Sequence, residues 1–109
     1  MQGLLQNRLM EKAKQLTPEV GMGATIILYS DRSACTIIEV APRRIVLQRD
    51  KTEEVGEQYS NIWKTTPDPK GAKDVFTLRK NGRWVKEKQS MHGTSALIGH
   101  RDHHFDYEF

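Results

Sequence analysis

The dipeptide Asn81-Gly82 constrains this chain more than any other feature, because it stands between two stretches of alternating residues. Asn-Gly favours a two-residue type I′ turn, in which both central residues take a positive φ angle. The sequence therefore predicts a β-hairpin that runs from about residue 75 to residue 88. In the register of a two-residue turn, Leu78 lies opposite Val85, and Arg79 lies opposite Trp84.

The two faces of this predicted hairpin differ in character. The apolar face carries Phe76, Leu78 and Val85, and the other face carries Thr77, Arg79, Trp84 and Lys86. Basic side chains neutralise phosphates, and an exposed indole can stack on an unpaired base. The candidate nucleic-acid-binding residues are therefore Arg79, Lys80, Arg83, Trp84 and Lys86. The competing interpretation is ordinary sheet surface, in which the indole lies across the aliphatic stems of its basic neighbours.

The length of 109 residues indicates one domain, which we divide into an N-terminal helix and linker (1–19) and a single β-rich domain (20–109). The single cysteine, Cys35, indicates a reducing compartment. No apolar run is long enough to span a bilayer, and the first residues do not resemble a signal peptide. The net charge of +3 is compatible with a polyanionic partner but does not require one.

Residues 4–16 have the pattern of a short amphipathic helix, with Leu5, Leu9, Ala13 and Leu16 at helical spacing. Thr17-Pro18 ends this helix, because the residue before a proline avoids the α region. A helix this short needs packing to be stable. We interpret it as a helix that docks on the sheet, and the alternative is a helix that binds a partner.

The rest of the chain predicts short strands over 24–29, 34–40, 45–49, 59–65 and 94–98, besides the hairpin, with 50–58 as a surface loop. The turn at Pro42 would pair Val40 with Ile45 and Ile38 with Leu47. Several strands are apolar on both faces, which favours closure of the sheet. The predicted fold class is mainly β with one N-terminal helix (α+β), as a small antiparallel barrel or strongly bent sheet of five to seven short strands.

Several stretches resemble a family of small uncharacterised proteins encoded by phages and prophages. The resemblance rests on residues 20–25, 30–40, 48–50 and 76–82, and on Arg101-Asp102 with Phe105-Asp106-Tyr107. It covers most of residues 20–109 and leaves the predicted helix outside. It implies a phage-derived, β-rich domain, and it transfers no catalytic residue.

The C-terminal segment alternates imidazole and carboxylate groups. If it is extended, His100, Asp102 and His104 share one face, and they are weak candidates for metal ligands. The ligand count falls short of a closed tetrahedral set, so the sequence predicts no metal site. The alternative is that Phe105, Tyr107 and Phe109 dock the segment on the barrel while the polar face stays in water.

Two further sets of residues have a catalytic and a structural interpretation. The acid–base doublets Asp31-Arg32, Arg49-Asp50 and Arg101-Asp102 are interpreted as a structural ion-pair network at one rim. Cys35 lies in an apolar strand and is interpreted as a small buried hydrophobic residue rather than a nucleophile.

The sequence thus predicts a non-enzymatic, phage-type binding module without a cofactor, located in the host cytoplasm. Its candidate partners are nucleic acid, bound through the basic hairpin face, or a host or phage protein. In the second case, the chain would be a structural or protein-interaction factor that uses the N-terminal helix or a sheet edge. No membrane association is expected, and the oligomeric state stays open.

Overall fold

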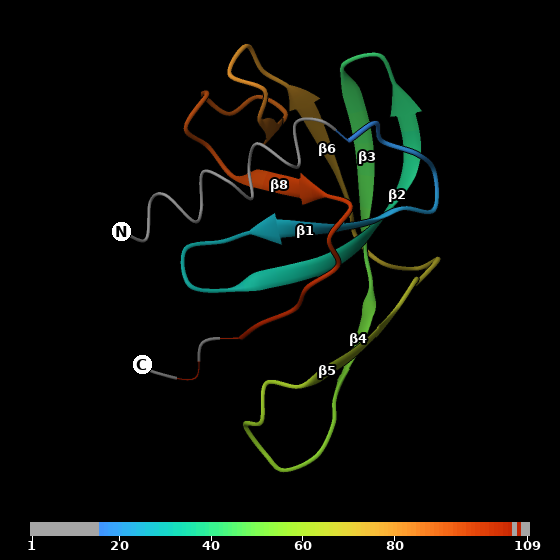
Figure 1. Cartoon of the computed structure of the whole chain (residues 1–109), viewed down its shortest axis with the longest axis vertical. Coiled ribbons are helices and arrows are strands. Elements are labelled where there is room, and N and C mark those ends of the chain that lie inside the picture. The colour runs from blue at the N-terminus through green and yellow to red at the C-terminus, as the bar shows by residue number, and fades with distance from the viewer. Residues whose placement is uncertain (1–15, 106, 108–109) are drawn as a thin grey trace.

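The computed structural model of the chain describes residues 16–105 and 107, and the regular elements in this part are all β-strands. Six strands form a closed antiparallel barrel, in which β1 pairs with both β2 and β8. They are β1 (Gly23–Ile27), β2 (Arg32–Ala41), β3 (Arg44–Arg49), β6 (Lys73–Leu78), β7 (Trp84–Lys86) and β8 (Ser95–Ile98). Two further strands, β4 (Lys51–Glu54) and β5 (Trp63–Thr66), form a separate ribbon that extends from the barrel (Figure 1). The predicted small barrel is confirmed.

The predicted α+β class is wrong, because the described residues are all-β and contain no helix. The helix expected over 4–16 lies outside the described residues except for Leu16, which is not helical. Leu16 leads directly into Thr17-Pro18, where the proline keeps the preceding residue out of the α region. The residues that follow form strands because they are rich in β-branched side chains, which favour β structure.

The barrel is filled by the inward-facing residues of its strands. The largest fully buried side chains include Ile26, Ile37, Ile45, Leu47 and Phe76. Such a core, with β-branched and aromatic residues at alternate positions, is what a small closed barrel requires.

The outer face of β1 and β2 is also buried, because the C-terminal segment crosses it. The hydroxyl of Thr25 donates to the carbonyl of His100 (2.6 Å) and accepts from the amide of Asp102 (2.9 Å). Further along, the backbones of Arg32 and His104 form a bridge. Burial from both sides explains why these strands lack the usual alternation of apolar and polar residues.

Three details of the predicted strands are wrong. Val40 pairs with Ile45 as expected, but Leu47 pairs with Ile37 instead of Ile38, because a β-bulge lies between Ile37 and Glu39. The expected loop over 50–58 contains β4, whose side chains are polar on both faces of the strand. The expected strand over 59–65 begins only at Trp63. A ribbon outside the core does not need an apolar face to form its ladder, so hydrophobic periodicity gave no signal here.

The hairpin also has a different register, shifted by one residue. Leu78 pairs with Trp84, and Thr77 pairs with Val85. The turn is a three-residue loop: the amide of Gly82 donates to the carbonyl of Arg79 (2.9 Å), and Gly82 alone in the turn has a positive φ (80°). A shift of one residue moves every side chain of one strand to the opposite face. Trp84 therefore points into the barrel, where it is 6% exposed, and not outward as predicted.

Cys35 gives a direct test of this core. The thiol is fully buried inside the barrel, and this burial raises its pKa to about 12. Because the thiolate is the reactive form, we expect native protein to resist a chromogenic disulfide reagent at mildly alkaline pH. The same reagent should titrate one thiol per chain once denaturant unfolds the protein. A rapid reaction in the native state would contradict the placement of Cys35.

Candidate binding groove at the barrel mouth

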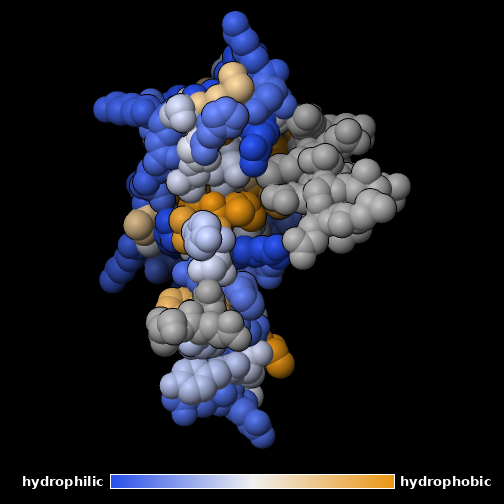
Figure 2. All heavy atoms as spheres, turned by 90° about the vertical axis from the view of Figure 1, so that its left-hand side faces the viewer, coloured by the Kyte–Doolittle hydropathy of each residue, from blue (hydrophilic) through white to orange (hydrophobic). Residues whose placement is uncertain are grey.

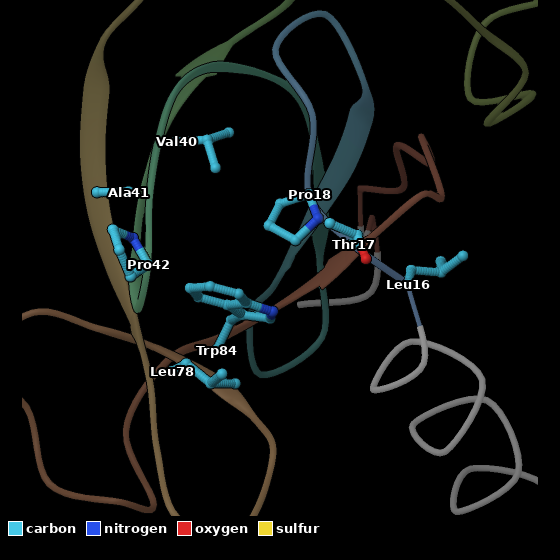
Figure 3. Close-up of a pocket in the computed structure, with 8 residues that line it drawn as sticks. All are labelled: Leu16, Thr17, Pro18, Val40, Ala41, Pro42, Leu78 and Trp84. Carbon is cyan, nitrogen blue, oxygen red and sulfur yellow. The ribbon is translucent and has the colours of Figure 1, made fainter.

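One end of the barrel carries an open, mostly apolar groove with a volume of about 420 Å³ (Figure 3). Its walls come from the segment before β1, the end of β2, the end of β6 and the start of β7. We call it the barrel-mouth groove; it is lined by Leu16, Thr17, Pro18, Val40, Ala41, Pro42, Leu78 and Trp84. The volume falls within the range of small-molecule and side-chain pockets, which are roughly 300–1,000 Å³.

Trp84 connects this groove to the core. Its indole packs among the buried hydrophobic side chains that fill the barrel, which we call the core cluster, and lies between Pro18 and Leu78 in Figure 3. Val40 on the far wall is 41% exposed, so the groove is open to solvent on that side. The groove thus combines a fixed aromatic floor with aliphatic walls. This suits an apolar side chain better than a stacked base, since little of the indole surface is accessible.

Two turns flank the groove, and both carry cationic residues without any acid. They are the β2–β3 turn (41–44) and the β6–β7 turn (79–83), which lie at the same end of the barrel (Figure 1). The backbone amide of Leu78 donates to the carbonyl of Arg43 (2.9 Å), and the Arg43 guanidinium donates to the carbonyl of Leu78 (3.0 Å). Together the turns contribute Arg43, Arg44, Arg79, Lys80 and Arg83, which we call the basic rim.

The structure divides the predicted nucleic-acid-binding residues between different surfaces. Arg79 turns outward, because its guanidinium donates to the Thr77 hydroxyl (2.8 Å) and to the Lys86 carbonyl (3.2 Å). The Lys86 ammonium instead lies 3.4 Å from the carboxylate of Asp74. Lys80 is exposed in the turn, close in sequence to the groove.

Arg83 has a guanidinium Nε that is enclosed without a hydrogen-bond partner among the described residues. Of the residues around the groove, the sequence predicted Trp84 on the floor and part of the basic rim, but not the walls at Pro18, Val40 and Pro42. The available signal was an apolar Val-Ala-Pro sequence at a strand end, directly before two arginines.

The acid–base doublets form a structural network near the opposite end of β2 and β3, as predicted. Nε of Arg101 lies 2.9 Å from Oδ2 of Asp50, a contact that is ionic rather than a well-aligned hydrogen bond, and the Asp50 side chain is fully buried. Thr36 bridges the two, since its hydroxyl donates to Asp50 (2.7 Å) and accepts from Arg101 (2.8 Å). Arg32 pairs with Asp102 at 3.0 Å on the surface.

The residues considered for a metal site do not converge. No group of three or more potential ligands (His, Cys, Asp, Glu) is close enough to hold a metal in the part of the chain that the structure describes. His103 accepts a hydrogen bond from the amide of Ala34 at Nδ1 (3.3 Å), and its ring forms a T-shaped contact with the ring of Trp63. Desolvation lowers the pKa of His103, which favours the neutral ring that this bond requires.

After the bridge between His104 and Arg32 of the barrel, Phe105 and Tyr107 contact the ribbon. The Asn61 side chain donates to the carbonyl of Phe105 (2.8 Å) and accepts from its amide (3.0 Å), as a neighbouring strand would. Glu54 accepts from the Tyr107 hydroxyl (2.7 Å). The predicted docking of Phe105 and Tyr107 on the barrel is therefore corrected to docking on the ribbon, and Phe109 lies outside the described residues.

The Tyr107–Glu54 bond gives a pH-dependent readout of this docking. The shared hydrogen bond is the main cause that raises the pKa of Tyr107 to about 12 and lowers the pKa of Glu54. Its stabilisation is therefore full below the unfolded tyrosine pKa of 10.0 and is lost as pH rises through about 12. On the acid side, it is full above the unfolded glutamate pKa of 4.5 and is lost as pH falls through the lowered value.

We expect Tyr107→Phe to remove from the ultraviolet absorbance titration a phenol with a midpoint of about 12. Tyr29→Phe, at a fully exposed tyrosine, is the control and should leave that transition in place. If the transition near 12 persists in Tyr107→Phe, the bond to Glu54 is absent in solution.

Nothing in the described residues forms a helix that could cross a membrane. The resemblance to phage-encoded proteins stays a prediction, as does the location in the host cytoplasm. Comparison with known proteins found no matching family model, no similar curated protein and no similar solved structure.

Proposed function

We propose that this chain is a non-enzymatic binding module that captures an acidic segment with one apolar anchor residue at the barrel mouth. The observation that carries the proposal is an open apolar groove between two turns that contain five cations and no acid. The anchor would enter the groove above Trp84, and the flanking carboxylates would lie against the basic rim. This belongs to the protein-interaction class rather than the nucleic-acid-binding class.

The chemistry of the groove supports this division of roles. Binding energy at protein interfaces concentrates in side chains that fill desolvated pockets, and the aliphatic walls at Val40, Pro42 and Leu78 supply such surface. Exposed rim charges mainly steer encounter and select partners by sign. Lys80 and Arg44 are exposed, so they can meet carboxylates without loss of an internal contact.

Nucleic acid is the second candidate, because the same rim cations could contact phosphates. It is less favoured because stacking needs an accessible aromatic face, and Trp84 is 6% exposed. The two candidates differ in what they require of the apolar walls. An acidic peptide needs the anchor residue, whereas an oligonucleotide depends chiefly on the cations.

Fluorescence anisotropy with three labelled probes tests the proposal. The probes are an acidic peptide with a central leucine, the same peptide with alanine in its place, and a single-stranded oligothymidine. We expect the leucine peptide to bind about tenfold more tightly than the alanine peptide, since burial of that side chain contributes about 1.5 kcal/mol. Binding of both peptides should weaken as salt increases.

Matched charge reversals locate the binding surface. Arg44→Glu combined with Lys80→Glu should abolish binding of the leucine peptide. Lys70→Glu combined with Lys73→Glu changes the net charge equally, at exposed positions before and at the start of β6, far from its groove end, and should preserve binding. Equal affinity for the two peptides would overturn the groove as the binding site. Tight binding of the oligothymidine alone would favour the nucleic-acid candidate.

A further inference from the structure

We infer that the acidic segment can be supplied by a second copy of this chain, through the ribbon tip, which we define as residues 53–62. In this arrangement, the ribbon tip of one molecule enters the barrel-mouth groove of the next. The inference rests on the proposed function, because it uses the same groove, and it names the partner. It follows from the charge, the exposed apolar side chains and the position of the ribbon tip.

The ribbon tip has the charge that the basic rim lacks. Residues 53–62 contain Glu53, Glu54 and Glu57 and no lysine or arginine. Glu54 is occupied by Tyr107 and by the amide of Asn61, so Glu53 and Glu57 remain as the exposed acids. All the charged residues of the two turns at the barrel mouth are cations, so the two surfaces are complementary in sign.

The ribbon tip also presents apolar surface. Tyr59 is 61% exposed and Ile62 is 60% exposed, and both lie within the loop that joins β4 to β5. Figure 2 shows the ribbon standing clear of the barrel, with apolar atoms near its end among mostly hydrophilic ones. Large side chains left in water at a protruding loop are the kind of anchor that the groove around Trp84 would accept.

The ribbon tip is held in one conformation, although that conformation is strained. Tyr59 and Asn61 both have positive φ angles (65° and 57°), a backbone region that is unfavourable for a residue such as Tyr59 and better tolerated by asparagine. Hydrogen bonds across the loop offset this cost: the amide of Val55 donates to Ile62 (2.8 Å), and the Ser60 hydroxyl donates to Val55 (2.7 Å). A loop fixed before binding loses less entropy when it docks, which favours association.

The position of the ribbon decides the geometry of the assembly. The ribbon lies at one end of the molecule, whereas the two turns of the basic rim lie at the other end (Figure 1). A ribbon tip therefore meets the groove of a different molecule, and the two contacting surfaces are different. Such a heterologous contact repeats head to tail, and it gives a ring if the rotation closes or a filament if it does not.

Sedimentation analysis of the full chain over a concentration series tests the inference, with two variants that each remove one surface. The tip variant is Glu57→Lys with Ile62→Ser, and the mouth variant is Arg44→Glu with Lys80→Glu. We expect the parent chain to form oligomers larger than dimers, and each variant alone to be monomeric. A mixture should form a dimer with one molecule of each, because the mouth variant keeps its tip and the tip variant keeps its groove.

Two control substitutions separate this contact from general changes in charge and hydrophobicity. Tyr29→Ser removes a fully exposed aromatic residue from the β1–β2 turn, and Lys73→Glu reverses an exposed charge on β6; both should leave assembly unchanged. A parent chain that stays monomeric overturns the inference, as does a mixture of the two variants that stays monomeric. If the acidic leucine peptide still binds in that case, the proposed function stands alone; if it does not bind, both fail.

Discussion

Replacing Trp84 by alanine is expected to lower the free energy of unfolding by about 3–5 kcal/mol, the usual cost of truncating a buried aromatic side chain. The indole is part of the core cluster and also forms the floor of the barrel-mouth groove. The loss combines the transfer free energy of the ring with the cavity that the surrounding barrel cannot fill. Chemical denaturation, analysed for both midpoint and slope, measures the change.

Trp63→Ala is the matched control for this substitution. Trp63 lies on the ribbon and is only half-buried, so its truncation should cost clearly less than that of Trp84. If Trp84→Ala costs less than about 1 kcal/mol, that cost is typical of an exposed surface residue. That result would indicate an outward-facing indole, and hence the two-residue turn that Asn81-Gly82 suggests.

Asp50→Ala is expected to destabilise the protein by about 2–3 kcal/mol, because it removes the partner of a charged group that is largely withdrawn from water. The Asp50 side chain is fully buried, and it accepts the Thr36 hydroxyl as well as the contact from Arg101. The substitution leaves Arg101, whose side chain is 29% exposed, without its anion. The partial exposure of Arg101 keeps the expected cost below that of a fully enclosed pair.

A double-mutant cycle isolates the interaction between Asp50 and Arg101. If the pair acts as a unit, Arg101→Ala should add little once Asp50 is already alanine. The exposed pair of Arg32 and Asp102 is the internal control, and Asp102→Ala should cost about 0–1 kcal/mol. Equal costs for Asp50→Ala and Asp102→Ala would mean that burial contributes nothing to the first pair.

The sequence was sufficient to predict the barrel because the barrel depends on patterns that are local. β-branched strands that are apolar on both faces, such as 24–27 and 33–37, require cover on two sides, and closure together with the crossing C-terminal segment supplies it. The turn at Pro42 also gave the correct pairing of Val40 with Ile45. The acid–base doublets indicated a network because charged pairs beside turns need partners.

The register of the hairpin could not be obtained in this way. Asn-Gly fits a two-residue turn, but its glycine fits a three-residue loop with a bulge equally well. The choice depends on which register buries Trp84, and that depends on strands β1 and β2, which lie far away in sequence. The β4 strand was missed for a related reason: its residues are polar, and its pairing with β5 leaves no hydrophobic pattern to detect.

The groove shows the same limitation at the level of the site. Its walls come from segments around Pro18, Val40 and Leu78, which are adjacent only after the barrel has closed. Sequence reasoning selected the cations and Trp84 from one hairpin and assigned them to a single exposed face. Lys80 and Arg83 lie in the β6–β7 turn that flanks the groove, but the indole points inward, so the candidate ligand changes from a base to an apolar side chain.

The closure of the barrel has a kinetic consequence. The hydrogen bond from Thr25 to His100 joins residues 75 positions apart, and β1 pairs with β8 over nearly the same separation. Contacts so distant in sequence raise the contact order, and domains of this kind fold in milliseconds to seconds rather than microseconds. While β8 is absent, β1 and β7 each present an unpaired edge, and the interval before closure is the time when intermolecular strand pairing competes with folding.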